Sequence, residues 1–190
     1  MPIESGWATI GPFFHSVLPW KEGGQMARPG TKGERVTILG RVLDAEGKPI
    51  NDAMIELWQA NAAGRYNHPE DRQEKPLDPA FIGFGRSATQ QDGSFRFQTI
   101  RPGRVPGRGN TLQAPHINLG FFSRGLLRRL VTRIYFEDCP ENSEDPVLAL
   151  ISDSARRATL LARRSAGADG VVYRFDIRLQ GEGETVFFDC

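Results

Sequence analysis

The sequence predicts a mainly β protein: a β-sandwich with a short helical insertion late in the chain and an apolar arm at the N-terminus. Apolar and polar residues alternate from Glu34 to Leu43 and again from Val171 to Leu179, which is the pattern of strands with one buried and one wetted face. Turn dipeptides containing glycine recur between the candidate strands, and one helical pattern interrupts them after Asp145. Many short strands with one helical segment favour two packed sheets.

In the first half of the chain, Glu46–Pro49 form a turn after the first strand, and a second strand follows from Ala53 to Trp58. Asp92-Gly93 is a strong hairpin signal. It leads into a strand from Phe95 to Ile100, which ends at Pro102-Gly103.

In the second half, His116–Phe122 and Leu130–Phe136 form a pair of strands joined through Ser123-Arg124-Gly125. A final pair follows Asp169-Gly170, because the continuous alternation from Val171 to Leu179 leads through a Gly-rich turn into a strand from Thr185 to Phe188.

The helical insertion begins at Asp145-Pro146, with Asp as the N-cap and Pro at the first helical position. Apolar residues follow at helical spacing as far as Ile151. Ala155–Arg164 is a second short helical run, with Leu160 and Leu161 on its inner side.

These patterns divide the chain into an arm with a connector, residues 1–33, and a sandwich domain, residues 34–190. The connector Lys21–Gly30 is rich in Gly and Pro and is expected to be flexible. Because an arm carrying Trp7 and Trp20 would be poorly solvated if free, we expect it to pack on its own sandwich or on a partner.

Composition excludes several classes of function. A net charge of +1 over 190 residues gives no nucleic-acid footprint and no polybasic membrane patch. Cys139 and Cys190 form neither a disulfide framework nor a zinc pattern. The N-terminus lacks the pattern of a signal peptide, and no apolar run approaches membrane-spanning length. We therefore expect a cytoplasmic protein.

Three motifs carry the chemistry: Trp58-Gln59-Ala60-Asn61 followed by Gly64-Arg65-Tyr66, then Arg101–Pro106, then Ala114–Leu119. Together they resemble the metal-site framework of the intradiol ring-cleaving dioxygenases. In that family two tyrosines and two histidines hold ferric iron, and the resemblance covers nearly the whole chain.

On this resemblance only Tyr66 and His116 stand at ligand positions, while Val105 and Asn118 replace the second tyrosine and the second histidine. Gln113 replaces an arginine that lies near the reacting ring. Ferric iron favours anionic oxygen, valine has no donor atom, and asparagine offers only a neutral amide. We therefore predict no metal site in this chain and expect Tyr66 and His116 to be structural.

Neither of the other histidines, His15 and His68, gives a spacing that restores the metal site. His68 is expected to be an exposed loop residue.

The resemblance is specifically to the iron-free chain of family members built from two homologous chains. It implies a partner chain that holds Fe(3+), in a larger oligomer that opens a catechol ring with O2, while this chain alone is inactive. The resemblance assigns substrate-binding roles at the partner's site to Thr9, Gly11, Pro12 and Arg133. Phe13 departs from relatives that often carry Tyr, and so loses a hydroxyl.

Arg133 also has a physical case, because a guanidinium offers a planar fork to a carboxylate. The alternative is a surface ion pair with Glu137 or Asp138. A related catechol with another anion, such as a sulfonate, would suit Arg133 equally.

Two other interpretations remain: a binding or scaffolding sandwich without an active partner, and a self-sufficient enzyme with a rebuilt metal site.

Overall fold

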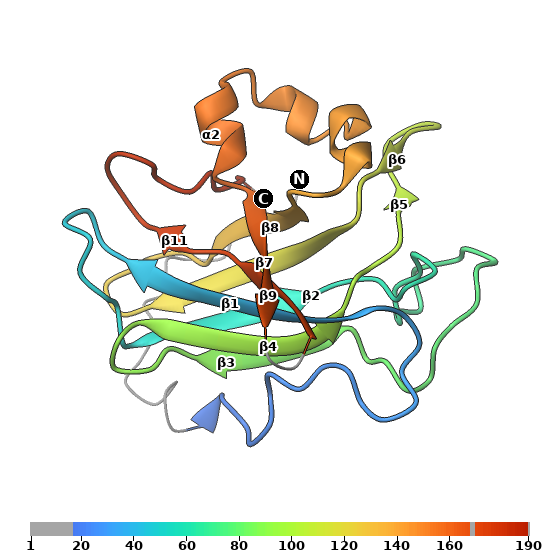
Figure 1. Ribbon diagram of the computed structural model, residues 1–190, viewed down its shortest axis with the longest axis horizontal. Coiled ribbons are helices and arrows are strands. Elements are labelled where there is room, and N and C mark those ends of the chain that lie inside the picture. Colours follow the sequence, from blue (N-terminus) through green and yellow to red (C-terminus); the bar gives the residue numbers. More distant parts are fainter. Residues whose placement is uncertain (1–16, 168–169, 190) are drawn as a thin grey trace.

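The computed structural model describes residues 17–167 and 170–189 and consists mainly of two layers of β-strands (Figure 1). One layer contains β1 (Arg35–Leu43), β4 (Ser94–Ile100), β10 (Gly170–Arg174) and β11 (Ile177–Arg178). The other contains β2 (Ala53–Trp58), β3 (Phe84–Ala88), β7 (His116–Ser123) and β8 (Leu130–Phe136).

Strand β9 (Leu161–Gly167) joins the two layers. It runs antiparallel to β10 and parallel to the end of β8, where Leu161 lies beside Tyr135. The hydrogen-bonded path is therefore continuous, in the order β11-β1-β10-β9-β8-β7-β2-β3, with β4 paired to β1. The result is a nearly closed sandwich, and the predicted mainly β fold is confirmed.

The core lies between the layers and follows the alternation of the strands. Ile38 and Phe97 from one layer, with Leu57, Ile117 and Ile134 from the other, are fully buried in one cluster. Burial of such side chains contributes roughly 1.5–3 kcal/mol each, so the apolar face of each strand fixes which side of the sheet faces outward.

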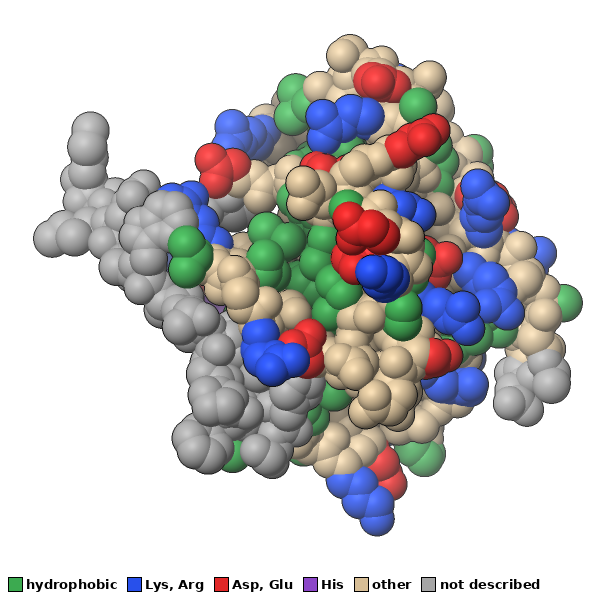
Figure 2. All heavy atoms as spheres, turned by 90° about the vertical axis from the view of Figure 1, so that its left-hand side faces the viewer, with side chains coloured by type: hydrophobic (Ala, Val, Ile, Leu, Met, Phe, Trp, Pro, Cys, Tyr) green, Lys and Arg blue, Asp and Glu red, His purple; other side chains and the backbone are tan. Residues whose placement is uncertain are grey.

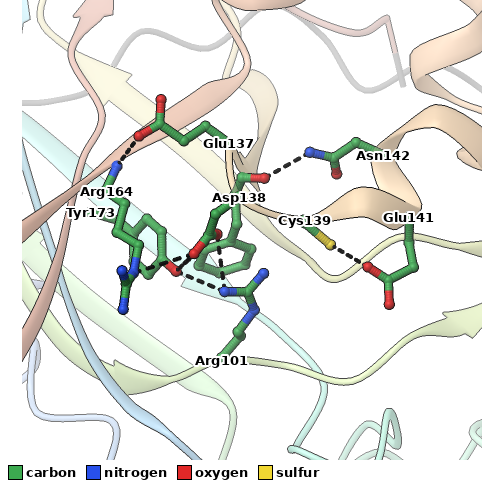
Figure 3. Close-up of polar contacts among 9 residues, drawn as sticks. Arg101, Glu137, Asp138, Cys139, Glu141, Asn142, Arg164 and Tyr173 are labelled. Carbon is green, nitrogen blue, oxygen red and sulfur yellow. Dashed lines mark hydrogen bonds and ion pairs between the residues drawn. The ribbon is translucent and has the colours of Figure 1, made fainter.

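A polar cluster ties the layers together where β8 ends (Figure 3). The carboxylate of Asp138 pairs with Arg101 at 3.0 Å and with Arg164 at 3.3 Å. It also accepts a hydrogen bond from the hydroxyl of Tyr173 at 3.0 Å. Burial, together with this hydrogen bond, raises the pKa of Tyr173 to about 12. The cluster therefore connects the ends of β4 and β8 to β9 and β10.

The helical segments gather at one end of the sandwich (Figure 1) and are shorter than predicted. They are the 3-10 turns η1 (Pro140–Glu144) and η2 (Leu148–Leu150) and the helix α2 (Ser154–Ala158). Asp145 caps the start of this segment as predicted, because its carboxylate accepts hydrogen bonds from the backbone N–H groups of Val147 and Leu148, each at 2.9 Å. The segment after this cap forms one 3-10 turn and not a longer helix.

The prediction of a helical run from Ala155 to Arg164 is wrong beyond Ala158. Asp153 caps α2, but from Leu161 onward the chain pairs with β8 and then with β10. Two ladders of backbone hydrogen bonds outweigh the helix propensity of this segment, which is rich in Ala, Leu and Arg.

The predicted continuous strand from Val171 to Leu179 is two strands. Between them the backbone N–H of Arg41 donates to the side chain of Asp176 at 2.9 Å, and Phe175 N–H donates to Leu39 O at 2.8 Å. The chain passes so close to β1 that a Cβ on Gly40 would lie 1.9 Å from the carbonyl oxygen of Phe175.

Two further predictions are corrected. Thr185–Phe188 is no strand, since among the described residues its pairing is the single bridge of Phe188 to Val131. Asp92-Gly93 does turn, but it links β3 to β4, which pair with β2 and β1 in different layers.

The missed strands are β3, β9 and the two-residue pair β5 (Val105–Pro106) and β6 (Leu112–Gln113).

The connector packs on the sandwich, contrary to the expectation that it is flexible. Met26 and Ala27 are buried in the core cluster, and Met26 N–H donates to Gln98 O at 2.8 Å. Trp20 stacks on Phe84. The division at residues 33 and 34 stays a prediction.

Two surface properties bear on the excluded functions. On the face shown in Figure 2, basic and acidic side chains lie interspersed, without a field of one sign. Within residues 17–167 and 170–189, none of the helices has the length and apolar character needed to cross a membrane.

Gly40→Ala should lower the free energy of unfolding by at least about 1–3 kcal/mol, because overpacking against the Phe175 backbone forces β1 and the β10–β11 connection apart. Urea denaturation measures this change. Gly120→Ala is the matched control, since the nearest atom to its Cβ is Arg129 Cδ at 3.4 Å. Equal stabilities of the two variants would contradict the close approach at Gly40.

Candidate functional site

A cavity of about 540 Å³ lies beside the outer face of the second layer. Its walls come from the end of β2, the start of β7, β8, the β5–β6 pair and the loop after Gly64. They include residues from all three motifs of the sequence and the two further positions singled out there: Trp58, Tyr66, Val105, Pro106 and His116, with Gln113 and Arg133. The fold therefore brings together residues that are far apart in the sequence.

A row of three cross-strand neighbours lies beside the cavity, and its two outer members, Trp58 and Arg133, line it. Trp58 on β2 is opposite Asn118 on β7, and Asn118 is opposite Arg133 on β8. Directly opposite residues in a sheet project on the same face. His116, two residues before Asn118, shares that face.

Tyr66 lies over this row and is held in place on two sides. Its ring stacks on Trp58 with centroids 5.6 Å apart, and its hydroxyl accepts a hydrogen bond from Asn118 Nδ2 at 3.2 Å. Burial raises the pKa of Tyr66, although the Asn118 hydrogen bond and the Arg133 charge act in the opposite direction. At neutral pH the side chain is therefore a phenol and not a phenolate.

His116 is a hydrogen-bonded core histidine, as expected from the sequence. Its Nδ1 donates to Ala114 O at 2.8 Å, and the side chain is 3% exposed. Burial lowers the pKa of His116 to about 4, and the neighbouring charge of Arg133 acts in the same direction. The ring is therefore neutral at pH 7.

Arg133 projects into the same cavity. Its Nη1 donates to Gln113 Oε1 at 2.6 Å and to the hydroxyl of Tyr135 at 3.3 Å. The alternative of a surface ion pair is wrong, because Asp138 pairs with Arg101 and Arg164, and Glu137 accepts from the backbone N–H of Arg164.

Two acidic residues, Glu70 and Asp71, line the loop side of the cavity, and Asp71 is hydrogen-bonded within its own loop. The carboxylate accepts from Tyr66 N at 2.8 Å, Gln73 N at 3.1 Å and Gln73 Nε2 at 3.0 Å. Desolvation raises the pKa of Asp71, but these hydrogen bonds outweigh it and hold the pKa below its usual value. The carboxylate is ionised and fixed.

The donor set of this cavity does not fit a ferric ion. The Tyr66 oxygen already accepts from Asn118, whose Nδ2 also donates to Trp58 O at 3.3 Å. Val105 is buried and has no donor atom. The guanidinium of Arg133 would repel a trivalent cation. Nowhere in the described part of the chain do three His, Cys, Asp or Glu side chains cluster as metal ligands.

Of the predicted substrate-binding residues, Arg133 lies in the cavity, whereas Thr9, Gly11 and Pro12 lie outside the described residues. His68 is exposed at the cavity edge, with its ring edge-on to Trp58. The position of Trp58 in the cavity wall was not predicted. Its membership of the first motif, Trp58-Gln59-Ala60-Asn61, was the signal that could have indicated it.

The support behind Arg133 was not predicted either. The Tyr135 hydroxyl that accepts from Arg133 donates to Asp145 Oδ1 at 3.1 Å. Asp145 was predicted only as a helix cap. Its second role carries no local signal, because it depends on contacts over ten or more residues.

Comparison with known proteins shows the family to which this fold belongs. The family model described as "Dioxygenase" matches residues 10–181. The dioxygenase domain of a carbohydrate-binding protein fusion from Streptomyces sp. SirexAA-E has a similar structure, with a TM-score of 0.65 and 27% identity, over 93% of this chain and 97% of that one. The chain therefore belongs to the intradiol dioxygenase family.

Within the family, it is a homologue of protocatechuate 3,4-dioxygenase alpha chains. It is 40% identical to the alpha chain of Pseudomonas putida over the full length of both proteins, and 41% identical to that of Burkholderia cepacia over 95% of this chain and 94% of the relative. It is also 38% identical to the beta chain of B. cepacia, over 95% of this chain and 77% of that relative.

The neutral state of His116 makes stability depend on pH. Between pH 6.5 and 4 the unfolded chain binds a proton that the folded chain excludes, so the free energy of unfolding falls as the pH falls. The loss is on the order of 3 kcal/mol, or about 6–12 °C in Tm. His116→Asn keeps a donor for Ala114 O and should remove this part of the pH dependence in thermal melts.

His68→Asn is the matched control, because His68 is exposed. It should melt with the pH dependence of the unmodified protein. If His116→Asn did so too, His116 would not be the group responsible.

Proposed function

We propose that this chain is the iron-free alpha subunit of a protocatechuate 3,4-dioxygenase, paired with a homologous beta chain in the cytoplasm. The complex would cleave protocatechuate with O2 between its two hydroxylated carbons, giving 3-carboxy-cis,cis-muconate. Fe(3+) would be held by the beta chain, and this chain alone would be inactive.

The donor set of the cavity carries this proposal. Identity alone separates alpha from beta poorly, since the chain is 40–41% identical to two alpha chains and 38% identical to a beta chain. What distinguishes the subunit role is a pocket with one phenol and one imidazole, in which Val105 and Asn118 stand in place of the second tyrosine and the second histidine. Family membership with a pocket unfit for iron favours a supporting subunit.

The N-terminal arm is proposed to line the partner's site through Thr9, Gly11 and Pro12. Glycine permits close approach of a backbone to a ligand, and proline fixes the chain direction. Trp20 stacks on Phe84 of the sandwich.

Arg133 is the fourth proposed substrate-binding residue. A sulfonated catechol would suit its guanidinium as well as a carboxylated one, so that substrate is the second candidate. A scaffold without an active partner is a third, and it has no observation of its own in its favour.

Iron content tests the subunit role. The chain purified alone should contain no iron and show no visible tyrosinate-to-iron absorption, and both should appear when a beta chain is co-expressed. Elemental analysis and absorption spectra measure this. Stoichiometric iron in the isolated chain would overturn the proposal, and a colourless, inactive complex would support the scaffold.

Arg133→Ala tests whether that residue serves the partner's site. It should raise KM for protocatechuate at least about tenfold, since losing a charge-assisted contact costs at least about 1.4 kcal/mol, and iron content should not change. Unsubstituted catechol is the control substrate, because it has no carboxylate to lose. Unaltered KM for protocatechuate would remove Arg133 from the partner's site.

A further inference from the structure

A second cavity, of about 550 Å³, shares no lining residue with the first. Its walls come from β1, β4, the end of β10 and the segment between β3 and β4. Three arginines line it, Arg41, Arg96 and Arg174, against one carboxylate, that of Asp176. The cavity is therefore basic, and the proposed function makes no use of it.

The register of the strands places the three arginines on one face of the first layer. Arg96 on β4 and Arg174 on β10 are both paired with Leu39 on β1, one from each side. Directly opposite residues project on the same face of a sheet, and Arg41, two residues after Leu39, shares that face. The residues that alternate with them on all three strands are buried in the core, so the arginines face outward.

The spacing of these strands allows Arg96 and Arg174 to act together. Neighbouring strands lie about 4.8 Å apart, so the Cα atoms of the two arginines are about 10 Å apart across β1. Extended arginine side chains reach more than half of that distance. The two guanidiniums can therefore hold one oxyanion between them above Leu39, each through its planar fork.

A fourth arginine extends the row and adds to its charge. Arg163 on β9 is directly opposite Arg174, and like charges at such positions destabilise a sheet. In the described part of the chain, none of the six ion pairs includes Arg96, Arg163 or Arg174. The row therefore has no counterion among these residues, and an anion bound to it would relieve the repulsion.

The nearest carboxylates do not supply that anion. Asp176 accepts a hydrogen bond from the backbone N–H of Arg41 at 2.9 Å, and Asp92 pairs with Arg41 Nη2 at 3.4 Å. Both carboxylates therefore lie beside Arg41 and leave Arg96 and Arg174 uncompensated. Glu22 lines a neighbouring pocket together with Arg96 but forms no ion pair with it.

The arrangement of the donors favours a phosphate over a carboxylate. One arginine fork occupies both oxygens of a carboxylate, whereas a phosphate ester presents three oxygens and a charge of about −1.5 to −2 at pH 7. Two forks can therefore bind one phosphate at once. Ser87, Gln90 and Ser94 also line the cavity and offer hydroxyl and amide donors.

We propose that this cavity, the arginine site, binds a small phosphate-bearing anion, with one phosphoryl group held between Arg96 and Arg174. The ligand is either free phosphate or the ester of a small alcohol, since the volume of about 550 Å³ lies in the usual range of small-molecule sites, about 300–1,000 Å³. The site uses no iron and no residue of the first cavity, so it goes beyond the proposed subunit role.

An NMR titration of the full-length chain, observed through its backbone amides at constant ionic strength, tests the site. The probes are inorganic phosphate, glycerol 3-phosphate, acetate and glycerol. Phosphate should bind at least tenfold more tightly than acetate, glycerol should not bind, and the shifted amides should cluster on β1, β4 and β10. Tighter binding of glycerol 3-phosphate than of phosphate would support an ester as the ligand, and equal binding would support free phosphate.

Three variants assign the binding to named side chains. Combining Arg96→Gln with Arg174→Gln should weaken phosphate binding at least tenfold, because neutral amides cannot pair with the anion. Arg96→Lys keeps the charge but loses the fork, so phosphate should bind more weakly and still be preferred over acetate. Arg108→Gln is the matched control, since Arg108 is exposed between β5 and β6 and lines neither cavity. It should bind phosphate as the unmodified chain does.

Equal affinities of phosphate and acetate for the unmodified chain would overturn the proposal, and this comparison needs no variant to fold. Amide shifts scattered around arginines outside the site would overturn it as well, as would full phosphate affinity in the folded double variant. The subunit role is judged separately by iron content, so either proposal can fail while the other stands.

Discussion

The buried carboxylate of Asp145 connects the fold to the cavity. It is 1% exposed and accepts from Ala114 N at 2.7 Å, from Val147 N and Leu148 N at 2.9 Å, and from the Tyr135 hydroxyl at 3.1 Å. A buried charge is tolerated only when such donors replace water. One side chain thereby fixes the approach to β7, the η2 turn and the tyrosine that supports Arg133.

The cavity lies where the family pattern places its metal framework, but its donor set differs from that pattern. Asn118, which replaces a histidine of the family pattern, is the direct cross-strand neighbour of Arg133, so this replacement lies beside the charged wall of the pocket. Burial lowers the pKa of His116 and raises that of Tyr66, while the charge of Arg133 acts to lower both. Both side chains keep the places that the family pattern gives them but remain neutral. The scaffold is preserved while the chemistry of its centre differs.

The strands and their faces were largely predictable, because period-2 alternation and turn residues are local signals. β1, β2, β4, β7 and β8 lie close to their predicted ranges. The first part of β9, as far as Arg164, was predicted to be helical, since Leu161 and Ala162 become a strand only by pairing with Tyr135 and Phe136, which lie 26 residues earlier. Such pairing overrides local propensity.

The sequence by itself determined the family pattern, the loss of metal donors at Val105 and Asn118, and the basic residue at Arg133, because each is a matter of residue type at a fixed spacing. Only the tertiary structure decided where Arg133 points and which groups it meets. Those properties depend on Gln113, Tyr135 and Asp145, which β6, β8 and the η1–η2 segment bring together. Hydrogen bonds between distant segments form only after the sheets have packed, so no local pattern encodes them.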